Sequence, residues 1–186
     1  MKDKFEFGYA SDVAAMVREQ LKTSCARIEI AGSLRRRKKE IGDIEIVYIP
    51  KTAVVTEEDL FGQSRNLTDR AIAALENSKV LERRKNIKGR EAFGDHIKLM
   101  RDVSSGVPVD LFATTEAAWW NYLVCRTGGA QSNMRIAALA KSRGYKWEPY
   151  SAGFWDPEKD ETIPMQSEED VFRFVGLPYE EPAARP

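Results

Sequence analysis

The amino-acid sequence predicts an α+β protein in which a mixed β-sheet with helices is followed by a small helix-rich lobe. Alternating apolar residues or β-branched runs predict strands over 27–31, 43–49 and 107–113. Apolar residues at four-residue spacing predict amphipathic helices over 12–24 and 67–78. After Thr115 the apolar pattern becomes helical. We therefore expect two domains, residues 1–113 and residues 114–186.

Turn and capping residues set the expected ends of the elements in the first domain. Ser11 is the expected N-cap of the first helix. Gly32-Ser33 is expected to break the first strand, and a basic loop should follow as far as Gly42. Residues 51–66 are interpreted as a connection, and residues 79–100 as short strands around a glycine-containing turn. Pro108 places the strand over 107–113 at an edge, or else lies early in that strand.

Similar signals divide the second domain. Thr127-Gly128-Gly129 should interrupt its first helical stretch. A further helix is expected over 132–143, with Gly144 at its C′ position. Ser167 to Asp170 has the spacing of a capping box and should open a last helix that runs through Val175.

Composition excludes several classes of protein. The chain has 186 residues, and no apolar run approaches the eighteen or so that a membrane helix needs. Its N-terminus lacks the apolar segment of a secretory signal. Cys25 and Cys125 are far apart and His96 is the only histidine, which argues against a zinc site. A cytoplasmic protein with two reduced thiols, no membrane partner and a monomeric state is expected.

The formal net charge is zero, which argues mildly against strong nucleic-acid binding. The distribution of charge matters more than its sum. Positive residues cluster at 35–39 and 83–85, with Lys88 and Arg90 close behind. A basic face is therefore possible on a neutral chain, and the 83–85 cluster is a candidate for DNA contact.

Three carboxylates form a candidate metal site. Asp43 and Glu45 point to the same face of one strand, with α-carbons about 6–7 Å apart. Two metal ions about 3.5–4 Å apart can be shared by carboxylates at that separation. Asp110 adds a third acid if its strand is a neighbour, and hard oxygen ligands favour Mg²⁺ or Mn²⁺ over zinc. Taken alone, a D-x-E pair more often lines a solvated strand face.

The segment just upstream favours the metal site over the solvated face. It comprises Gly32, Ser33 and a run of arginines after the first strand, and Gly42 stands directly before Asp43. A serine hydroxyl, backbone N–H groups and arginine side chains can all bind phosphate oxygens. An isolated Gly-Ser would be a solvated basic turn. Before a carboxylate pair it is interpreted as a triphosphate cradle.

Four segments of the chain resemble a known family of enzymes. AGSLRRRKKEIGDIEIVYIP is similar to the G-S-x-R-R … G-D-x-[DE] signature of the DNA polymerase β superfamily of nucleotidyltransferases. GVPVDLFAT resembles the later strand that supplies a third carboxylate. RTGGAQSNMRIAALAKSRGYKW and SEEDVFRFVGLPYEEPAARP resemble two thumb segments of family X DNA polymerases. The first motif is shared by many nucleotidyltransferases, whereas the thumb segments are more specific to family X.

The resemblance implies a palm over 1–113, a thumb over 114–186 and a role for each matching residue. Asp43, Glu45 and Asp110 would hold two Mg²⁺ or Mn²⁺ ions and would be the catalytic carboxylates. The nucleotide-binding residues implied by the match are Gly32, Ser33, Arg36, Gly42, Thr127, Gly128 and Asn133. Arg135 would contact the templating DNA strand.

The sequence also departs from the family pattern. Glu45 stands where these polymerases usually carry Asp. Ile41 stands where the family often has a serine that contacts phosphate. Cys125-Arg126 replaces an aromatic pair that lies against the sugar, and Asn133 and Arg135 are closer together than usual. Only a short helix is expected before the palm motif, so the helix-hairpin-helix domains of the family and any lyase domain are expected to be absent.

The implied function is a small family X-like DNA polymerase that adds nucleotides from (d)NTP to a DNA 3′ end by two-metal phosphoryl transfer. Its expected role would be short gap filling or repair synthesis on primer–template or gapped DNA. One alternative is a nucleotidyltransferase that acts on a non-DNA acceptor, which the G-S … D-x-E motif alone allows. Another is a catalytically inactive nucleic-acid-binding relative, against which the three retained acids argue.

Overall fold

The computed structural model describes residues 3–53 and 66–186, so most of the connection expected over 51–66 lies outside the described residues. The chain forms two compact units. The first unit contains the chain up to Ile30 together with Glu40–Ala113. The second unit contains Ala31–Lys39 together with Thr114–Pro186. The short segment Ala31–Lys39 therefore leaves the first unit and returns to it within nine residues.

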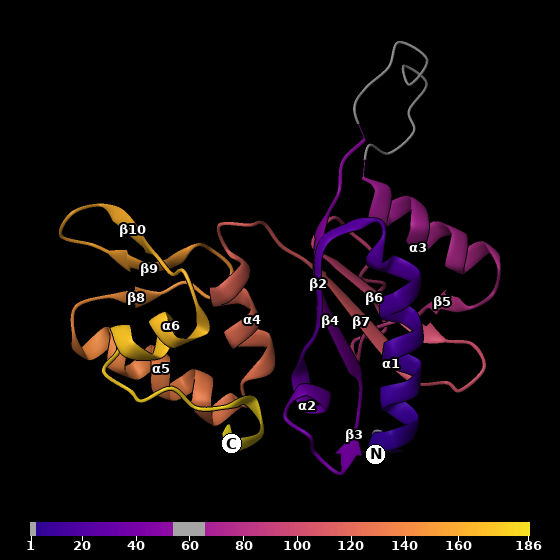
Figure 1. The fold of residues 1–186 in the computed structure, drawn as a ribbon, viewed down its shortest axis with the longest axis horizontal. Coiled ribbons are helices and arrows are strands. Elements are labelled where there is room, and N and C mark those ends of the chain that lie inside the picture. The colour runs from indigo at the N-terminus through magenta and orange to yellow at the C-terminus, as the bar shows by residue number, and fades with distance from the viewer. Residues whose placement is uncertain (1–2, 54–65) are drawn as a thin grey trace. The chain divides into compact units, whose positions relative to one another are not determined.

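A five-stranded mixed sheet forms the centre of the first unit (Figure 1). Its strands are β2 (Cys25–Ile30), β4 (Ile44–Pro50), β7 (Pro108–Ala113), β6 (Ile97–Asp102) and β5 (Leu81–Arg83), in that spatial order. β4 and β7 are parallel neighbours, and the other pairs are antiparallel. Two short strands, β1 (Phe5–Glu6) and β3 (Glu40–Ile41), pair separately. The predicted α+β class with a mixed sheet is confirmed.

The strand that carries Asp110 lies in the middle of this sheet. β7 pairs with β4 on one side and with β6 on the other. Pro108 is its first residue, where the missing N–H costs least, so the early position is correct and the edge position is wrong. Central placement buries Val109 and Leu111 completely.

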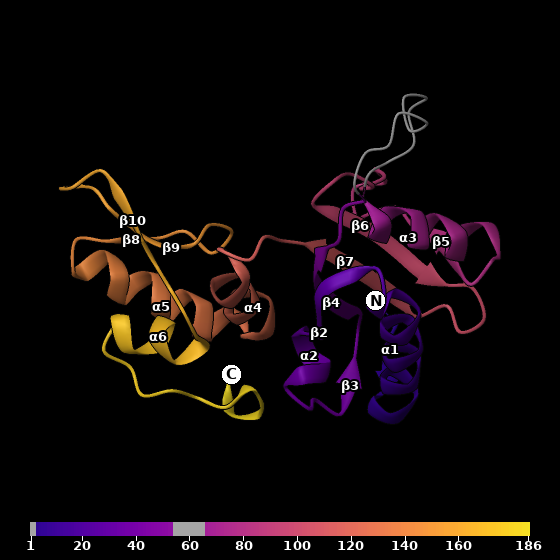
Figure 2. The same ribbon diagram turned by 45° about the horizontal axis from the view of Figure 1, so that its top comes forward.

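Two helices pack against this sheet and against each other. α1 (Phe7–Lys22) contacts β2 and β4, and α3 (Leu67–Asn77) contacts β4 and β5 (Figures 1 and 2). α1 begins at Phe7, before the N-cap expected at Ser11, because Phe7 to Ala10 already continue its helical repeat. α3 is capped by Asn66, whose side chain accepts a hydrogen bond from the Asp69 backbone N–H.

The second unit combines helices with a small sheet. Its helices are α2 (Gly32–Arg35), α4 (Trp119–Thr127), α5 (Ala130–Ser142), α6 (Glu168–Phe174) and the 3₁₀ turn η2 (Pro182–Ala184). Its strands are β8 (Lys146–Trp147), β9 (Gly153–Asp156) and β10 (Glu161–Pro164), which form an antiparallel sheet in the order β10-β9-β8. The sequence predicted α4, α5 and α6, but it did not predict this sheet. It also predicted a loop where α2 lies.

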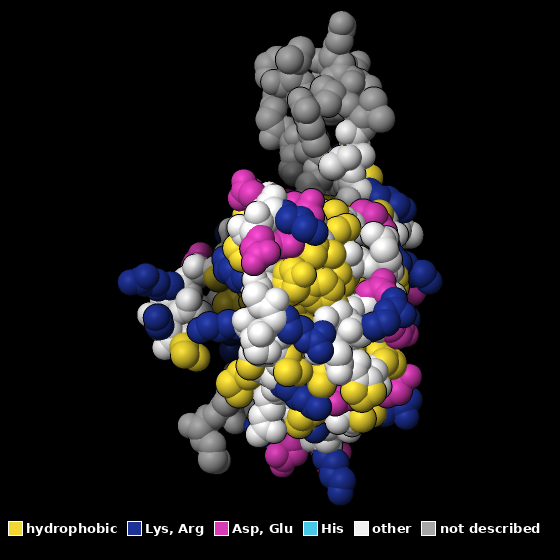
Figure 3. Space-filling view, turned by 90° about the vertical axis from the view of Figure 1, so that its left-hand side faces the viewer, with side chains coloured by type: hydrophobic (Ala, Val, Ile, Leu, Met, Phe, Trp, Pro, Cys, Tyr) yellow, Lys and Arg dark blue, Asp and Glu magenta, His cyan; other side chains and the backbone are white. Residues whose placement is uncertain are grey.

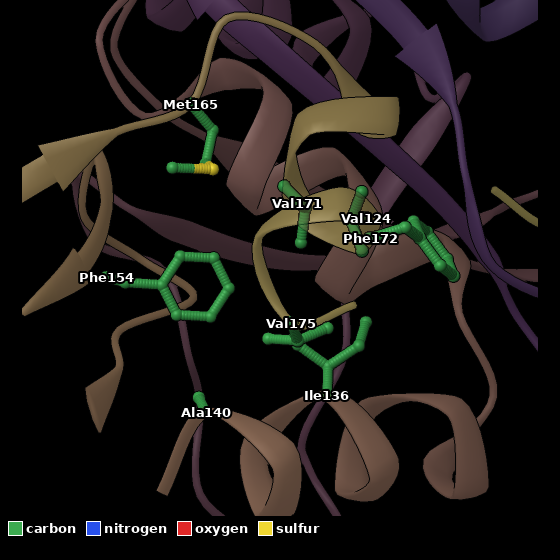
Figure 4. Close-up of a cluster of buried hydrophobic side chains, with 8 residues drawn as sticks. All are labelled: Val124, Ile136, Ala140, Phe154, Met165, Val171, Phe172 and Val175. Atoms are coloured by element: carbon green, nitrogen blue, oxygen red, sulfur yellow. The ribbon is translucent and has the colours of Figure 1, made fainter. Parts of the chain in front are cut away.

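A hydrophobic cluster joins the helices of the second unit to β9 (Figure 4). α5 contributes Ile136, α6 contributes Phe172 and β9 contributes Phe154, and all three are fully buried. The Phe154 ring stacks on Phe174 with centroids 4.3 Å apart. The small sheet thus closes the core formed by α4, α5 and α6.

Predicted helix ends in this unit are confirmed in two places. The Ser167 side chain accepts a hydrogen bond from the Asp170 backbone N–H, as a capping residue does. The Asp170 carboxylate accepts from the Gln166 N–H, one residue earlier than an ideal capping box requires. Gly144 follows α5 with φ of 85°, as expected of a C′ glycine.

Charged side chains of both signs surround an apolar area on the face shown in Figure 3. This mixture agrees with the zero net charge of the chain. Among the residues that the structure describes, no helix is both long and apolar enough to cross a membrane.

Candidate active site

Two of the three predicted acids are direct neighbours in the central sheet. In the parallel pairing of β4 with β7, Glu45 is the register partner of Asp110. Side chains alternate along a strand, so both acids lie on the face opposite to Ile44 and Ile46, which are fully buried. Asp43 directly precedes β4 and is partly exposed. The strands therefore bring Glu45 and Asp110 together and place Asp43 at the entry of the same strand.

An arginine that the sequence analysis assigned to DNA contact lies against one of these acids. The Arg84 guanidinium forms an ion pair and hydrogen bond with the Asp110 carboxylate. Both side chains are largely buried, with 18% and 12% of their surfaces exposed. Arg84 reaches Asp110 because it directly follows β5, whose neighbour β6 pairs with β7. The sequence gives no local signal for this pair.

The three acids are suitable in chemistry for a hard divalent cation, because carboxylate oxygens are its preferred ligands. Within residues 3–53 and 66–186, however, no three acidic, histidine or cysteine side chains are grouped closely enough to hold a metal ion. The ion pair with Arg84 occupies part of the coordination capacity of Asp110. A metal ion at Asp110 would thus have to share this carboxylate with the guanidinium or displace it.

The turn before β7 is held by a second aspartate. The Asp102 carboxylate accepts hydrogen bonds from the Ser104 hydroxyl at 2.7 Å and from the backbone N–H and hydroxyl of Ser105 at 2.8 and 2.5 Å. Burial raises the Asp102 pKa, but the hydrogen bonds from Ser105 and Ser104 outweigh it and leave the pKa below its ordinary value. Asp102 therefore fixes the turn from which the Asp110 strand begins.

The predicted phosphate-binding segment belongs to the second unit. Gly32 and Ser33 open α2, and Gly32 is buried with φ of 61°. The Ser33 hydroxyl oxygen is buried, and no described residue offers it a hydrogen bond. A buried hydroxyl without a partner is costly, so it marks a position that a polar ligand could satisfy. Gly42 is buried in the first unit, directly before Asp43.

Two arginines fasten α2 to the end of α4. Arg35 donates to the Thr127 hydroxyl at 2.8 Å, and Arg36 donates to the Thr127 carbonyl at 2.5 Å. Arg35 also donates to Glu168 at 2.5 Å, and the other oxygen of Glu168 accepts from Arg185 at 2.7 Å. Glu168 is thus a buried acid between two arginines, of which Arg185 is fully buried. Sequence reasoning did not find this triad, because its members are far apart along the chain.

Three predicted nucleotide-binding residues meet at the junction of α4 and α5. The Asn133 amide donates to the Cys125 carbonyl at 2.8 Å, and its buried carbonyl oxygen faces Gly128. A Cβ atom at Gly128 would approach that oxygen to 2.7 Å, so only glycine fits without displacement. Thr127 is fully buried. The structure therefore brings Thr127, Gly128 and Asn133 together with Arg36.

The residue after Cys125 contacts two neighbouring aromatic rings, whose centroids are 5.3 Å apart. The Arg126 guanidinium lies 5.6 Å from the Tyr122 ring centroid and 5.4 Å from that of Tyr150. Burial raises the pKa of Tyr122, and the charge of Arg126 opposes part of that rise. Position 126 thus carries a side chain fixed by cation–π contacts in place of the family's second aromatic residue.

The remaining predicted contacts lie on the surface. Arg135 forms an ion pair with Glu180 at 3.1 Å, and 55% of the Arg135 side chain is exposed. Arg83 forms an ion pair with Glu76 at 2.7 Å and lies over the Phe93 ring. Both arginines therefore have acidic partners within the chain.

Comparisons with known proteins agree with the motifs. Residues 122–186 match the DNA polymerase beta thumb family. The DNA polymerase/3′-5′ exonuclease PolX of Bacillus subtilis is 24% identical over 186 residues, which cover 98% of this chain and 29% of PolX. The chain thus spans less than a third of the length of that relative.

Solved structures show the same fold. The ternary P/T complex of Leishmania infantum polymerase beta matches with a TM-score of 0.75 and 20% identity, covering 99% of this chain and 77% of that one. Its ternary gap complex matches with a TM-score of 0.76 and 20% identity, covering 98% and 71%. Sequence and fold thus agree with the resemblance: residues 122–186 match the DNA polymerase beta thumb family, and the fold of the chain is similar to that of polymerase beta.

Proposed function

We propose that the chain is a small DNA polymerase that adds nucleotides from (d)NTP to a DNA 3′ end, with residues 1–113 as palm and residues 114–186 as thumb. The observation that carries the proposal is the register pairing of Glu45 with Asp110, with Asp43 at the entry of β4. Three acids on adjacent strands repel one another unless cations lie between them. This arrangement is suited to metal-assisted phosphoryl transfer.

Two Mg²⁺ or Mn²⁺ ions would bind at this site. Asp43 and Glu45 would both bind the two ions, and Asp110 would bind one of the two. When bound, the ions activate the primer 3′-hydroxyl and neutralise charge on the triphosphate. Asp110 would also be the candidate to accept the proton of that hydroxyl. The Arg84 guanidinium forms an ion pair with the Asp110 carboxylate.

The triphosphate would be bound by the Ala31–Lys39 segment and Gly42. Ser33 supplies a buried hydroxyl that the described protein leaves without a hydrogen bond, and Arg36 supplies positive charge in the same segment. Thr127, Gly128 and Asn133 would bind the sugar and base.

DNA is the proposed acceptor because the similar Leishmania infantum structures are ternary P/T and gap complexes. Gapped or primer–template DNA in short repair synthesis is the proposed substrate. Arg135 would contact the template if its exposed guanidinium exchanges Glu180 for a phosphate. A neutral chain should make few phosphate contacts, so we expect weak, salt-sensitive binding and distributive synthesis.

Primer extension on gapped DNA, with Mg²⁺ and each dNTP, tests the proposal. Asp43→Ala, Glu45→Ala and Asp110→Ala should each nearly abolish incorporation, whereas Glu45→Asp should stay active. Asp95→Ala, which removes an exposed acid of the same unit, is the matched control and should be unaffected. Wild-type turnover in Asp110→Ala would refute the three-acid site. Transfer only to a non-DNA acceptor, or DNA binding without incorporation, would favour one of the alternative functions.

A further inference from the structure

The outermost strand of the first unit has an open backbone edge. β2 is a terminal strand of the five-stranded sheet, and among the described strands it pairs with β4 alone (Figure 1). Ala26 is exposed, and the next four residues, up to Ile30, are half-buried. A terminal strand presents a row of N–H and C=O groups that can pair with a strand of another chain.

One hydrogen bond shows which backbone groups of β2 face outward. The Glu29 carboxylate accepts the backbone N–H of Ile30 at 3.0 Å, so this N–H is not directed at β4. In an antiparallel ladder, the N–H and C=O of one residue point to the same side, and that side recurs at every second residue. Ile28 and Ile30 therefore direct their backbone groups away from β4, whereas Arg27 and Glu29 direct theirs toward it.

The charges of β2 are complementary to those of a second β2. When two copies pair antiparallel with Ile28 opposite Ile28, Arg27 of each copy lies opposite Glu29 of the other. The backbone is compatible with this register, because the outward N–H and C=O of Ile28 can bond to those of its own copy. Arg27 and Glu29 then occupy the pairs without mutual backbone bonds, whose α-carbons are only about 4.5 Å apart. Opposite charges at directly opposed positions stabilise an antiparallel pair.

The two faces of β2 also match in this register. Arg27 and Glu29 share one face of the sheet, and Ile28 and Ile30 share the other, because side chains alternate along a strand. A two-fold axis through Ile28, perpendicular to the sheet, keeps each face on its own side. The four charged side chains therefore meet on one face. On the other face the two Ile28 side chains are neighbours, and Ile30 of each copy lies opposite Ala26 of the other.

We propose that the edge of β2 binds a second copy of this chain, antiparallel and two-fold symmetric, so that the two five-stranded sheets become continuous. The Ile30 N–H bonds to the Ala26 carbonyl of the second copy, and the Glu29 carboxylate that it leaves pairs with Arg27 of that copy. Such an interface uses the same residues on both sides. It is short, so the dimer is weak and forms at high protein concentration. This state differs from the monomer expected from the sequence, and it does not depend on the proposed polymerase activity.

Sedimentation of the full chain over a concentration series tests the proposal. Wild type should pass reversibly from monomer to dimer as the concentration rises. Arg27→Glu and Glu29→Arg each place like charges opposite one another at two positions, and each should raise the dimer dissociation constant about tenfold or more. Lys88→Glu is the matched control, because it reverses one exposed charge between β5 and β6, at the other end of the sheet, and should leave the constant unchanged. A wild type that is still monomeric at about 1 mM, or equal dimerisation by wild type and both β2 variants, would overturn the proposal.

Mixing the two charge variants tests the register. When an Arg27→Glu chain pairs with a Glu29→Arg chain, each glutamate again lies opposite an arginine. The mixture should therefore dimerise at a concentration where neither variant does so alone. The double variant Arg27→Glu/Glu29→Arg exchanges the two charges and should dimerise as the wild type does. Because restoration requires folded chains, it separates loss of the contact from loss of the fold, and failure of both restorations would overturn the proposed pairing.

Amide hydrogen exchange, followed by NMR, tests the backbone pairing directly. The outward N–H of Ile28 should exchange quickly in dilute solution and more slowly at concentrations where the chain is dimeric. The Glu29 N–H faces β4 and should exchange slowly at both concentrations, so it serves as the internal reference. A dimer in which Ile28 exchange is unchanged would refute pairing through β2. Asp110→Ala should dimerise as the wild type does, whatever its effect on primer extension, so the dimer and the polymerase activity are tested separately.

Discussion

Arg84 pairs with Asp110, the acid that the motifs identify as a metal ligand, and both side chains are largely buried. This guanidinium supplies positive charge beside Asp110, whose register partner in the neighbouring strand is Glu45. A bound divalent ion would supply that charge instead. A metal ion at Asp110 would therefore compete with Arg84 for this carboxylate.

We predict that Arg84→Gln lowers the unfolding free energy by about 1–3 kcal/mol without metal, because a buried acid loses its partner. Saturating Mn²⁺ should reduce this deficit, because the ion replaces the lost charge. Thermal unfolding with and without Mn²⁺ measures both values. Arg101→Gln is the control, since its pair with Glu82 is exposed and contributes little. An equal deficit in both conditions would show that Arg84 and metal do not compete.

Asp102 should make stability depend on pH at the acidic end. Its pKa is lowered in the folded chain relative to about 3.9 in the unfolded chain, so its contribution is complete above that value. The contribution is lost as the pH falls through the folded pKa. Asp102→Asn should lower the free energy of unfolding by about 1–2 kcal/mol at pH 7. It should also make that free energy depend less on pH below about pH 4. Urea unfolding at a series of pH values tests this, and an unchanged acid limb would contradict it.

Gly128 and Asn133 should be energetically coupled. Gly128→Ala would force a Cβ atom to within 2.7 Å of the Asn133 side-chain oxygen and should cost about 1–3 kcal/mol. In an Asn133→Ala background that oxygen is absent, and the same substitution should cost less. A double-mutant cycle measures the coupling. Additive costs would indicate that the nearby Val124 carbonyl, at 3.1 Å, is the obstacle.

The triad around Glu168 should be the most sensitive charged group of the second unit. Glu168→Gln leaves Arg35 and the fully buried Arg185 without a carboxylate, and should cost about 3 kcal/mol or more. Arg173→Ala removes a surface pair from the same helix, with 77% of the arginine side chain exposed, and should change stability by less than about 0.5 kcal/mol. Urea unfolding of the two variants makes the comparison. Similar losses of stability in the two variants would show that the triad contributes no more than a surface ion pair.

The sequence predicts those parts of the fold that depend on local pattern. The strands of Asp43, Glu45 and Asp110 are predicted because alternation and β-branched content are local properties. The direct register pairing of Glu45 with Asp110 joins residues 65 positions apart. The order of the motifs suggested that their strands are neighbours, but it could not predict the register. The α1 start was missed because Phe7 to Ala10 contain no capping signal.

Other features lack any local signal. The strands β8, β9 and β10 have two to four residues each, too short for alternation to be recognised. The charge run 83–85 looks uniform in sequence, yet the strand order directs Arg83 to Glu76 and Arg84 to Asp110. α2 has four residues and no side-chain cap, so only its tertiary partners reveal it.

The placement of Ala31–Lys39 in the second unit has a consequence for the order of folding. Arg35 and Glu168 are 133 positions apart, and Arg35 and Thr127 are 92 apart. During synthesis the sheet of the first unit has all its strands once Ala113 has emerged, whereas α2 must wait for α4 and α6. Closing so long a loop is entropically slow, and contacts of high sequence separation form late. We expect α2, the segment with the buried Ser33 hydroxyl, to be the last part of the chain to gain protection from amide hydrogen exchange during refolding.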